Sequence, residues 1–398
     1  MSAICNKINS YLPLLGYLTV GAVGLATYID SGMPVALTAI AAAGYAVKKF
    51  FQKEEPVVRP PQERRLSEKV ILLPTEGRLA EIQNQKASCF CTTVLWAFFA
   101  NNRSALDGLP SAILREWNLL APASDEDVEL HQILQIRGAI TLKKLRELRQ
   151  LLQLREKEGR LNGQLNKMLS LLELHKMVRM TLKQKPNVSA AAMRKIAARV
   201  NGSFRDTGSQ FGDADEIFRI LGALIFEDSP DQQTLTDRLG RKENNWGAIP
   251  LCLEEGLTLS DLFVSQYEGA EFDRPPEFIA FTVKRNDVVV EERKFSPNEF
   301  DYVSIDLLNP INPNEEFSLN RPFFKNGAAA SYELTGIVRR IKRDGIRHYD
   351  AFWKGKSGQW YQGDDLGVSG NGATVKRVSK NFTFREVKSG YLFFYQKM

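Results

Sequence analysis

The fold is decided by the stretch Asn84–Asn101, which reads NQKASCFCTTVLWAFFAN. A polar turn leads into a cysteine and then into apolar residues at helical spacing: Val94, Leu95, Phe98 and Phe99. This spacing predicts a helix with one strongly apolar, buried face. Ser88 suits the N-cap, which places Cys89 in the first turn. There the helix dipole favours negative charge, and a thiolate near neutral pH is expected.

A plainer interpretation of Cys89 stands beside this one. A cysteine at the start of an apolar helix is more often a small core residue than a nucleophile. The choice depends on a partner elsewhere, and the chain has only three histidines. His131 and His175 lie among leucines on predicted helices, where structural or surface roles are favoured. His348 instead opens a predicted strand and is followed by Tyr349.

Composition limits the classes of function. The chain has 398 residues, of which 43% are hydrophobic and 25% are charged, as in globular proteins with one large or two smaller domains. The net charge of +6 is too small to indicate nucleic-acid binding without a recognised module. The cysteines are Cys5, Cys89, Cys91 and Cys252. Their spacing contains no C-x-x-C pair, so neither a zinc ribbon nor a thioredoxin-like motif is present. A reducing compartment fits best, and no metal or cofactor is predicted.

The first 50 residues predict a transmembrane helical hairpin. Ile8–Ile29 is an uncharged run of about 22 residues, enough to span a bilayer. A turn at Asp30–Pro34 separates it from a shorter apolar run, Val35–Val47. Basic residues follow at Lys48 and Lys49, so the positive-inside rule places the rest of the chain in the cytosol. A signal peptide and a soluble hairpin packed on the domain are the alternatives.

The remaining chain divides by composition. Residues 51–69 are polar and proline-rich and predict a linker, whereas residues 70–398 predict one domain. Residues 70–248 are mainly helical in pattern, and Val70–Leu73 predicts either a short strand or a lead-in to the cysteine stretch. From residue 249 onward, strands alternate with Gly, Asn and Asp turns. The predicted class is therefore α+β, with an antiparallel sheet.

A hairpin in this second half would create a catalytic constellation. The strand that starts at His348 is followed sixteen residues later by the pair Asp364 and Asp365. Pairing of the two strands brings Asp364 beside the imidazole. A histidine oriented by a carboxylate is the base that a cysteine nucleophile such as Cys89 requires.

With these residues in place, the chain resembles the ubiquitin-specific proteases. The family's cysteine box, N-x-G-[NA]-T-C-Y-M-N-S-x-L-Q, is matched by Asn84–Trp96, and its Q-Q-D-A-x-E-F block by Phe211–Ile217. The G-H-Y-x-A-[YF] and W-Y-x-[FY]-[DN]-D parts of its histidine box are matched by Arg347–Phe352 and Trp360–Asp365. The closing Y-x-L-x-Y strand is matched by Tyr391–Tyr395. All four blocks agree in order and spacing.

The resemblance implies a papain-like cysteine protease fold with a helical thumb at residues 70–248 and an antiparallel β palm at residues 249–398. It implies that Cys89 attacks the carbonyl after the last glycine of ubiquitin or a ubiquitin-like modifier. His348 would take the thiol proton, Asp364 would orient the imidazole, and Asp365 would support or replace it. Asn84 would donate to the oxyanion. Residues implied to bind the substrate are Asp213, Glu216 and Tyr349.

Departures from the family pattern accompany the match. Arg347 stands for the glycine before the histidine, and Gly363 stands where an aromatic residue is usual. The zinc-binding cysteine pairs are missing, and residues 251–274 leave little room for fingers, so reduced fingers are expected.

Together these features predict a deubiquitinase anchored through residues 8–47 to a host-cell or vacuole membrane and facing the cytosol. The combination also resembles effectors that intracellular bacteria place in vacuole membranes. An inactive ubiquitin-binding relative and a membrane-anchored scaffold are the alternatives.

Overall fold

The computed structural model describes most of the unit Arg64–Met398. The ranges outside the description are 1–63, 75–76, 83–87, 124–126, 136–137, 186–187, 203, 205–211, 228, 230–232, 237–241, 245–246, 253–258, 268–271, 273, 285–316, 320–329, 344–345, 367–372 and 379–389. The predicted membrane hairpin at residues 8–47 therefore lies outside the described residues. Within the described residues, no helix combines the length and apolar character that crossing a bilayer requires.

The first half of the described chain is helical, as its apolar periodicity predicts. The helices are α3 (Cys89–Phe99), α4 (Arg103–Ala123), α5 (Val128–Leu134), α6 (Leu142–Lys157), α7 (Gly163–Leu182), α8 (Ala190–Val200) and α9 (Ala214–Phe226). Several begin at side chains that accept a hydrogen bond from the first turn: Asp127, Thr141, Asn162 and Asp213. Such caps satisfy amides that the helix leaves without partners and fix where each helix starts.

The second half forms an eight-stranded sheet with the order β11-β10-β9-β8-β12-β6-β5, and β7 pairs with β8. The strands are β5 (Ile249–Cys252), β6 (Phe278–Lys284), β7 (Phe317–Leu319), β8 (Ala330–Arg343), β9 (Ile346–Lys354), β10 (Trp360–Asp364), β11 (Thr374–Arg377) and β12 (Gly390–Lys397). All the pairings are antiparallel except that of β5 with β6. Helix α10 (Leu259–Gln266) follows β5. The predicted mixture of helices and an antiparallel sheet is thus confirmed.

Several details differ from the sequence-based expectations. Residues Val70–Leu73 do not form a strand: Glu68–Val70 is a short 3-10 helix, η2. Within the predicted linker, Arg65–Leu66 forms β1, which pairs with β2 (Ala139–Ile140). The region predicted to be helical also contains β2 and the hairpin of β3 (Thr234–Thr236) with β4 (Lys242–Asn244). These pairs are too short to leave a period-two pattern in the sequence. The expected strands at 288–290 and 302–305 lie outside the described residues.

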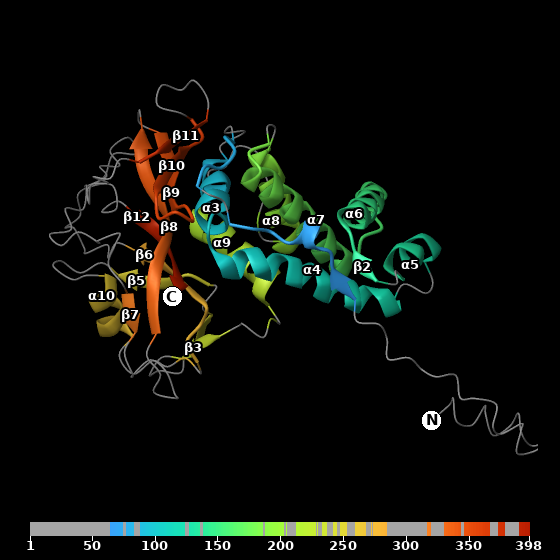
Figure 1. Ribbon diagram of the computed structural model, residues 1–398, viewed down its shortest axis with the longest axis horizontal. Helices are drawn as coiled ribbons and strands as arrows, with labels where there is room; N and C mark the ends of the chain where they lie inside the picture. Colours follow the sequence, from blue (N-terminus) through green and yellow to red (C-terminus); the bar gives the residue numbers. More distant parts are fainter. Residues whose placement is uncertain are drawn as a thin grey trace, which may run out of the picture. The chain divides into compact units, whose positions relative to one another are not determined.

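Helix α3 lies between the sheet and the other helices (Figure 1). It contacts β8, β9 and β10 on one side and α7, α8 and α9 on the other. All eleven of its residues are buried, so the prediction of a single buried face was too narrow. Phe98 alone packs against Phe218, Phe278 and Phe394. Burial on all sides explains why polar residues are almost absent from this helix.

Two glycines allow the sheet to approach α3 closely. A Cβ added at Gly336 in β8 would lie 2.3 Å from the Ala97 carbonyl oxygen. A Cβ added at Gly363 in β10 would lie 2.5 Å from the ring of Trp96 and 2.8 Å from that of Trp353. The glycine that replaces the family's usual aromatic at position 363 therefore makes room for two tryptophan rings.

The closeness of α3 and β8 predicts a large effect of one methyl group. Gly336→Ala should lower the free energy of unfolding by about 1–3 kcal/mol or more, because backbone atoms of α3 cannot move aside cheaply. Gly202→Ala is a matched control, since no atom of the described residues lies within 4 Å of an added Cβ there. Urea denaturation of both variants tests this, and equal stabilities would contradict close packing at Gly336.

Candidate active site

Cys89 is the first residue of α3, as the sequence predicts, and its side chain is buried with 1% exposure. Ser88 occupies the N-cap position, but its side chain makes no capping hydrogen bond. The Ser88 carbonyl oxygen instead accepts from the amides of Cys91 and Thr92 at 2.9 and 3.1 Å. The cysteine is therefore held at the helix start by backbone geometry and packing.

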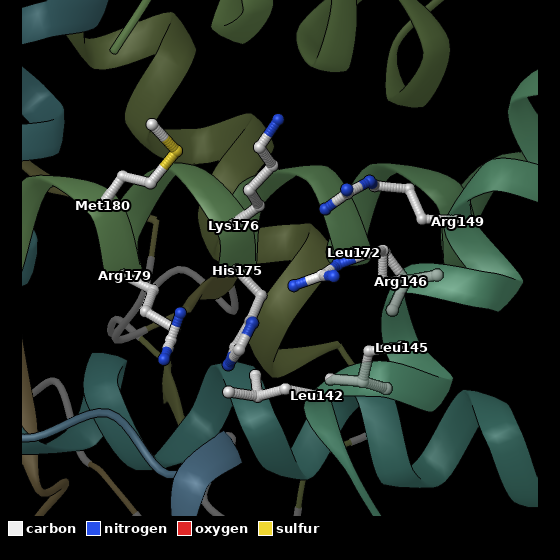
Figure 2. Close-up of a pocket in the computed structure, with 9 residues that line it drawn as sticks. All are labelled: Leu142, Leu145, Arg146, Arg149, Leu172, His175, Lys176, Arg179 and Met180. Carbon is white, nitrogen blue, oxygen red and sulfur yellow. The ribbon is translucent and has the colours of Figure 1, made fainter. Parts of the chain in front are cut away.

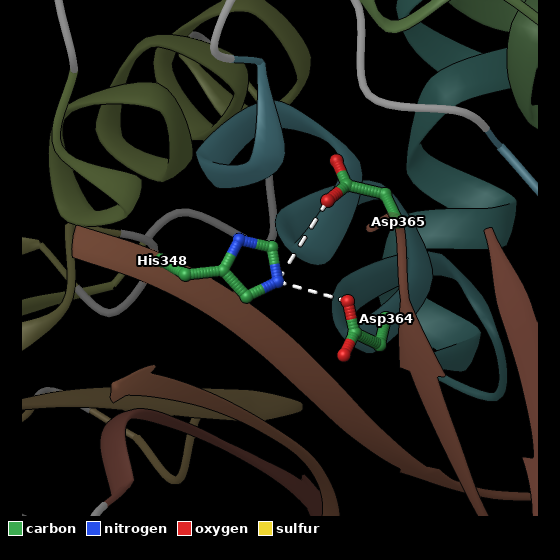
Figure 3. A group of neighbouring side chains, drawn as sticks. All are labelled: His348, Asp364 and Asp365. Atoms are coloured by element: carbon green, nitrogen blue, oxygen red, sulfur yellow. Dashed lines mark hydrogen bonds and ion pairs between the residues drawn. The ribbon is translucent and has the colours of Figure 1, made fainter. Parts of the chain in front are cut away.

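His348 and Asp364 are brought together by the predicted hairpin. Strands β9 and β10 pair with Phe352 opposite Gln362 and Ala351 opposite Gly363. His348 is buried, and its Nε2 lies 2.9 Å from Asp364 Oδ1 (Figure 3). The same oxygen accepts from the Leu366 amide at 2.9 Å, which fixes the carboxylate. In the part of the chain that the structure describes, His348 Nδ1 has no hydrogen-bond partner.

Asp365 lies on the same side of the imidazole. Its Oδ1 is 3.8 Å from His348 Nε2, and the residue is only 1% exposed. Neither carboxylate oxygen has a hydrogen-bond partner of good geometry among the described residues; the nearby Thr92 hydroxyl lowers the Asp365 pKa but donates to the Ser88 carbonyl oxygen. Burial dominates and raises the pKa of Asp365 to about 7. A carboxyl that is half-protonated near neutral pH is therefore part of this site.

The environment of Cys89 reverses one sequence-based expectation. Burial, and then the negative charge of Asp365, raise the pKa of the thiol to about 12. Backbone hydrogen bonds from Tyr349 and from the first turn of α3 lower it, but by less. The expected thiolate near neutral pH is thus wrong for the free protein, because desolvation outweighs the helix N-terminus. The backbone hydrogen bond from Tyr349 places the thiol beside the residue that follows His348.

The residues expected to bind substrate gather at the start of α9. Asp213 caps this helix and accepts a hydrogen bond from the Tyr391 hydroxyl at 2.8 Å. Tyr349 is buried and stacks obliquely on Tyr391, with ring centroids 6.0 Å apart. Burial and the charge of Asp213 raise the Tyr349 pKa. Burial, followed by the charges of Asp213 and Asp215, raises the Glu216 pKa, so negative charge accumulates here.

One predicted residue and one unpredicted group complete the account. Asn84, the expected oxyanion donor, lies outside the described residues.

Asp350 is buried two residues after His348 and pairs through both oxygens with Arg339 on β8, while Gln362 donates to it at 2.9 Å. These bonds tie β8, β9 and β10 together beside the imidazole. Charged residues within strands were the only signal for them, and sequence alone does not pair such residues across strands.

The histidine and the two aspartates have ligand types that suit a metal ion. One ligand atom from each of His348, Asp364 and Asp365 lies within 4.8 Å of the others. However, Asp364 Oδ1 is already bound to the imidazole and to the Leu366 amide, at 2.9 Å each. The arrangement fits a histidine oriented by a carboxylate, next to a buried thiol.

Comparison with known families agrees with this geometry. The family model of ubiquitin carboxyl-terminal hydrolases matches residues 80–395, which include the cysteine, histidine and aspartates described above. The chain belongs to this family and is, by class, a cysteine deubiquitinase. Comparison with curated protein sequences finds no match.

Solved structures show weaker likeness. The SAGA DUB module Ubp8/Sgf11/Sus1/Sgf73 bound to monoubiquitin aligns over 92% of this chain and 76% of its own, at 13% identity and a TM-score of 0.42. A ubiquitin aldehyde complex of that module covers 92% and 76%, at 12% identity and a TM-score of 0.40. A yeast SAGA module structure covers 82% and 69%, at 14% identity and a TM-score of 0.37. The assignment therefore rests on the family match.

The raised pKa of Asp365 predicts a pH-dependent stability. An unfolded aspartate titrates near 3.9, so folding takes up a proton between about pH 4 and pH 7. Stability is then highest below pH 4 for this group and falls as pH rises, by a few kcal/mol in total. Asp365→Asn removes the titration, so urea midpoints should decline from pH 5 to pH 8 in the wild type more than in the variant. Parallel curves would contradict a raised pKa.

Proposed function

We propose that the chain hydrolyses the peptide or isopeptide bond that follows the C-terminal glycine of ubiquitin or a ubiquitin-like modifier. One observation carries the proposal. Asp364 binds His348 at Nε2, and His348 Nδ1 has no hydrogen-bond partner in the described structure. Tyr349, the next residue on the same strand, makes a backbone hydrogen bond to the Cys89 thiol. Family membership supplies the class of substrate, and the site supplies the means of attack.

In the proposed mechanism, the sulfur of Cys89 attacks the carbonyl carbon of the terminal glycine. The thiol proton passes to His348 Nδ1, and the imidazolium then gives it to the leaving lysine amine. Water hydrolyses the resulting thioester and frees the nucleophile. We assign Asp364 to orienting the ring, Asp365 to supporting its charge, and Asn84 to the oxyanion, a contribution of about 3–4 kcal/mol in comparable sites.

The high pKa of Cys89 has a place in this mechanism. A neutral thiol in the free enzyme resists alkylation and oxidation, since the thiolate is the reactive form. The proton must then leave during attack, when His348 accepts it and negative charge moves from sulfur onto the oxyanion. We infer that substrate binding aligns the thiol with His348 Nδ1.

The acidic group at the start of α9 is the proposed grip on the modifier. Ubiquitin-like modifiers approach such enzymes with an extended C-terminal tail, and the resemblance pairs the family's tail-binding acids with Asp213 and Glu216. Asp215 is already bound by Arg219 and by the Thr282 hydroxyl. Glu216 is only part-buried and is the better placed to meet a basic tail. Tyr349 would pack beside that tail.

We propose further that residues 8–47 anchor the enzyme in a membrane, with the catalytic unit in the cytosol. The support is the length of the apolar runs and their basic flank. Their arrangement fits an effector that a bacterium delivers to a host membrane. In this proposal, the catalytic unit at residues 70–398 consists of a helical thumb, a β palm and reduced fingers.

Reaction with electrophilic probes tests the proposed nucleophile. The full chain is incubated with probes that carry a C-terminal electrophile on ubiquitin, the neddylation modifier, SUMO or the interferon-induced ubiquitin-like modifier. An adduct with at least one probe is expected, detected by intact mass, and it should vanish in Cys89→Ala. Cys91→Ala is the matched control, since Cys91 is equally buried two residues further along α3, and it should react as the wild type does.

The set of probes also separates the alternatives. Reaction with one probe alone identifies the modifier class. Binding of a modifier without any adduct, in a folded protein, would contradict catalysis and favour the inactive ubiquitin-binding relative. Neither binding nor reaction would leave the scaffold alternative.

Membrane flotation tests the anchor. The full chain, expressed in cells, should float with membranes and resist extraction at alkaline pH, whereas a chain lacking residues 1–50 should remain in the soluble fraction. The probe reaction of the shortened chain shows that its catalytic unit is folded. Release of the full chain by alkaline extraction would contradict a transmembrane hairpin and would favour a peripheral or soluble hairpin.

A further inference from the structure

A cavity between α6 and α7 lies outside the residues of the candidate active site. It has a volume of about 250 Å³, near the lower limit of about 300 Å³ for small-molecule sites. Its floor is apolar and includes the buried side chains of Leu145 and Leu172. Its remaining walls carry four cations: Arg146, Arg149, Lys176 and Arg179. Figure 2 shows the side chains of Arg146 and Arg149 extending from α6 toward α7.

None of the four cations forms an ion pair or side-chain hydrogen bond with another described residue. The nearby acids are occupied elsewhere. Glu173 is held by Arg199 and accepts from Gln153 at 2.8 Å. Glu147 pairs with Lys144 at 2.7 Å and more loosely with Lys143 at 4.0 Å, on the same helix. Within the described part of the protein, the positive charge around the cavity is therefore offset only in part, by the charge of Glu173 near Arg149.

The cations are close enough to affect one another. Burial lowers the pKa of the half-buried Arg149; the charge of Glu173 opposes this, and the neighbouring Arg146 lowers it further. His175 also lines the cavity and is fixed by a hydrogen bond of 2.7 Å between its Nε2 and the Val70 carbonyl oxygen. Burial lowers its pKa, and so do Arg179 and Arg149. Charges of one sign held close together repel each other, and a bound anion would relieve that repulsion.

We propose that this cavity binds a compact molecule with two or more phosphate groups, either a free polyphosphate or the phosphorylated headgroup of an inositol lipid. Guanidinium groups match phosphate oxygens in pairs, and two of them face one concavity from α6 while Arg179 faces it from α7. Both helices are regular and buried along one side, so the cations are held on a rigid frame.

Binding of inositol hexakisphosphate to the full chain, measured by calorimetry, tests the site. Arg146→Gln combined with Arg149→Gln should weaken binding by about tenfold or more, since each removes a charge-assisted contact. Lys376→Gln combined with Arg377→Gln is the matched control: it removes the same charge at exposed positions on β11 and should change affinity by less than about twofold. Thermal unfolding checks that every variant is folded. Lys176→Gln, at an exposed position, provides a milder change in the same cavity.

Vesicles separate the two sources of the phosphate groups. Phosphatidylcholine vesicles with and without phosphatidylinositol bisphosphate are compared, so that any insertion by other segments cancels. Dependence on the phosphorylated lipid that the cavity variants abolish supports a lipid headgroup, and binding of the free polyphosphate alone supports a soluble ligand. Absence of both, equal loss in the control variant, or tighter binding of single-stranded RNA through the same residues would overturn the proposal.

Discussion

The complete burial of α3 is the constraint on which the rest of the structure depends. Helix α3 is covered by the sheet on one face and by helices on the other. Both layers must pack close to its backbone. Gly336 and Gly363 provide that approach on the sheet. On the outer edge, the indole of Trp96 donates to the Ala80 carbonyl oxygen at 3.0 Å, and that of Trp353 donates to Gly77 at 2.5 Å. The segment before the cysteine is thereby tied to α3 through Trp96 and to the sheet through Trp353.

The same packing sets the chemistry of the site and also opposes it. Burial positions Cys89 beside the strand that carries His348, but burial also raises the pKa of the thiol and of Asp365. A solvated cysteine at a helix start would ionise more readily, yet it would lose the fixed geometry. The arrangement favours a fixed position of the thiol over its reactivity in the free protein.

Much of the fold and of the candidate site could be predicted from the sequence, for identifiable reasons. The start of α3 follows from local spacing, and the meeting of His348 with Asp364 follows from a short hairpin whose strands are neighbours in sequence. The electrostatic effect of Asp365 on Cys89 could not be predicted, since 276 residues separate groups whose distance depends on how α3 lies across the sheet. The cationic cavity was missed for a related reason: its arginines look like ordinary solvated faces until α6 and α7 are packed side by side.

Strand β12 has a further consequence, for biosynthesis. It is the last strand of the sheet in sequence, yet it lies in the middle, between β8 and β6. A ribosome-bound chain that has produced the cysteine, the histidine and both aspartates still lacks the strand that joins the two parts of the sheet. Residues Gly390–Lys397 must emerge before β8 can be joined to β6, and they carry the Phe394 ring that packs on Phe98 of α3. The nascent protein thus carries the cysteine, the histidine and both aspartates before its sheet is continuous, and the emergence of β12 is the step that joins the two parts of the sheet.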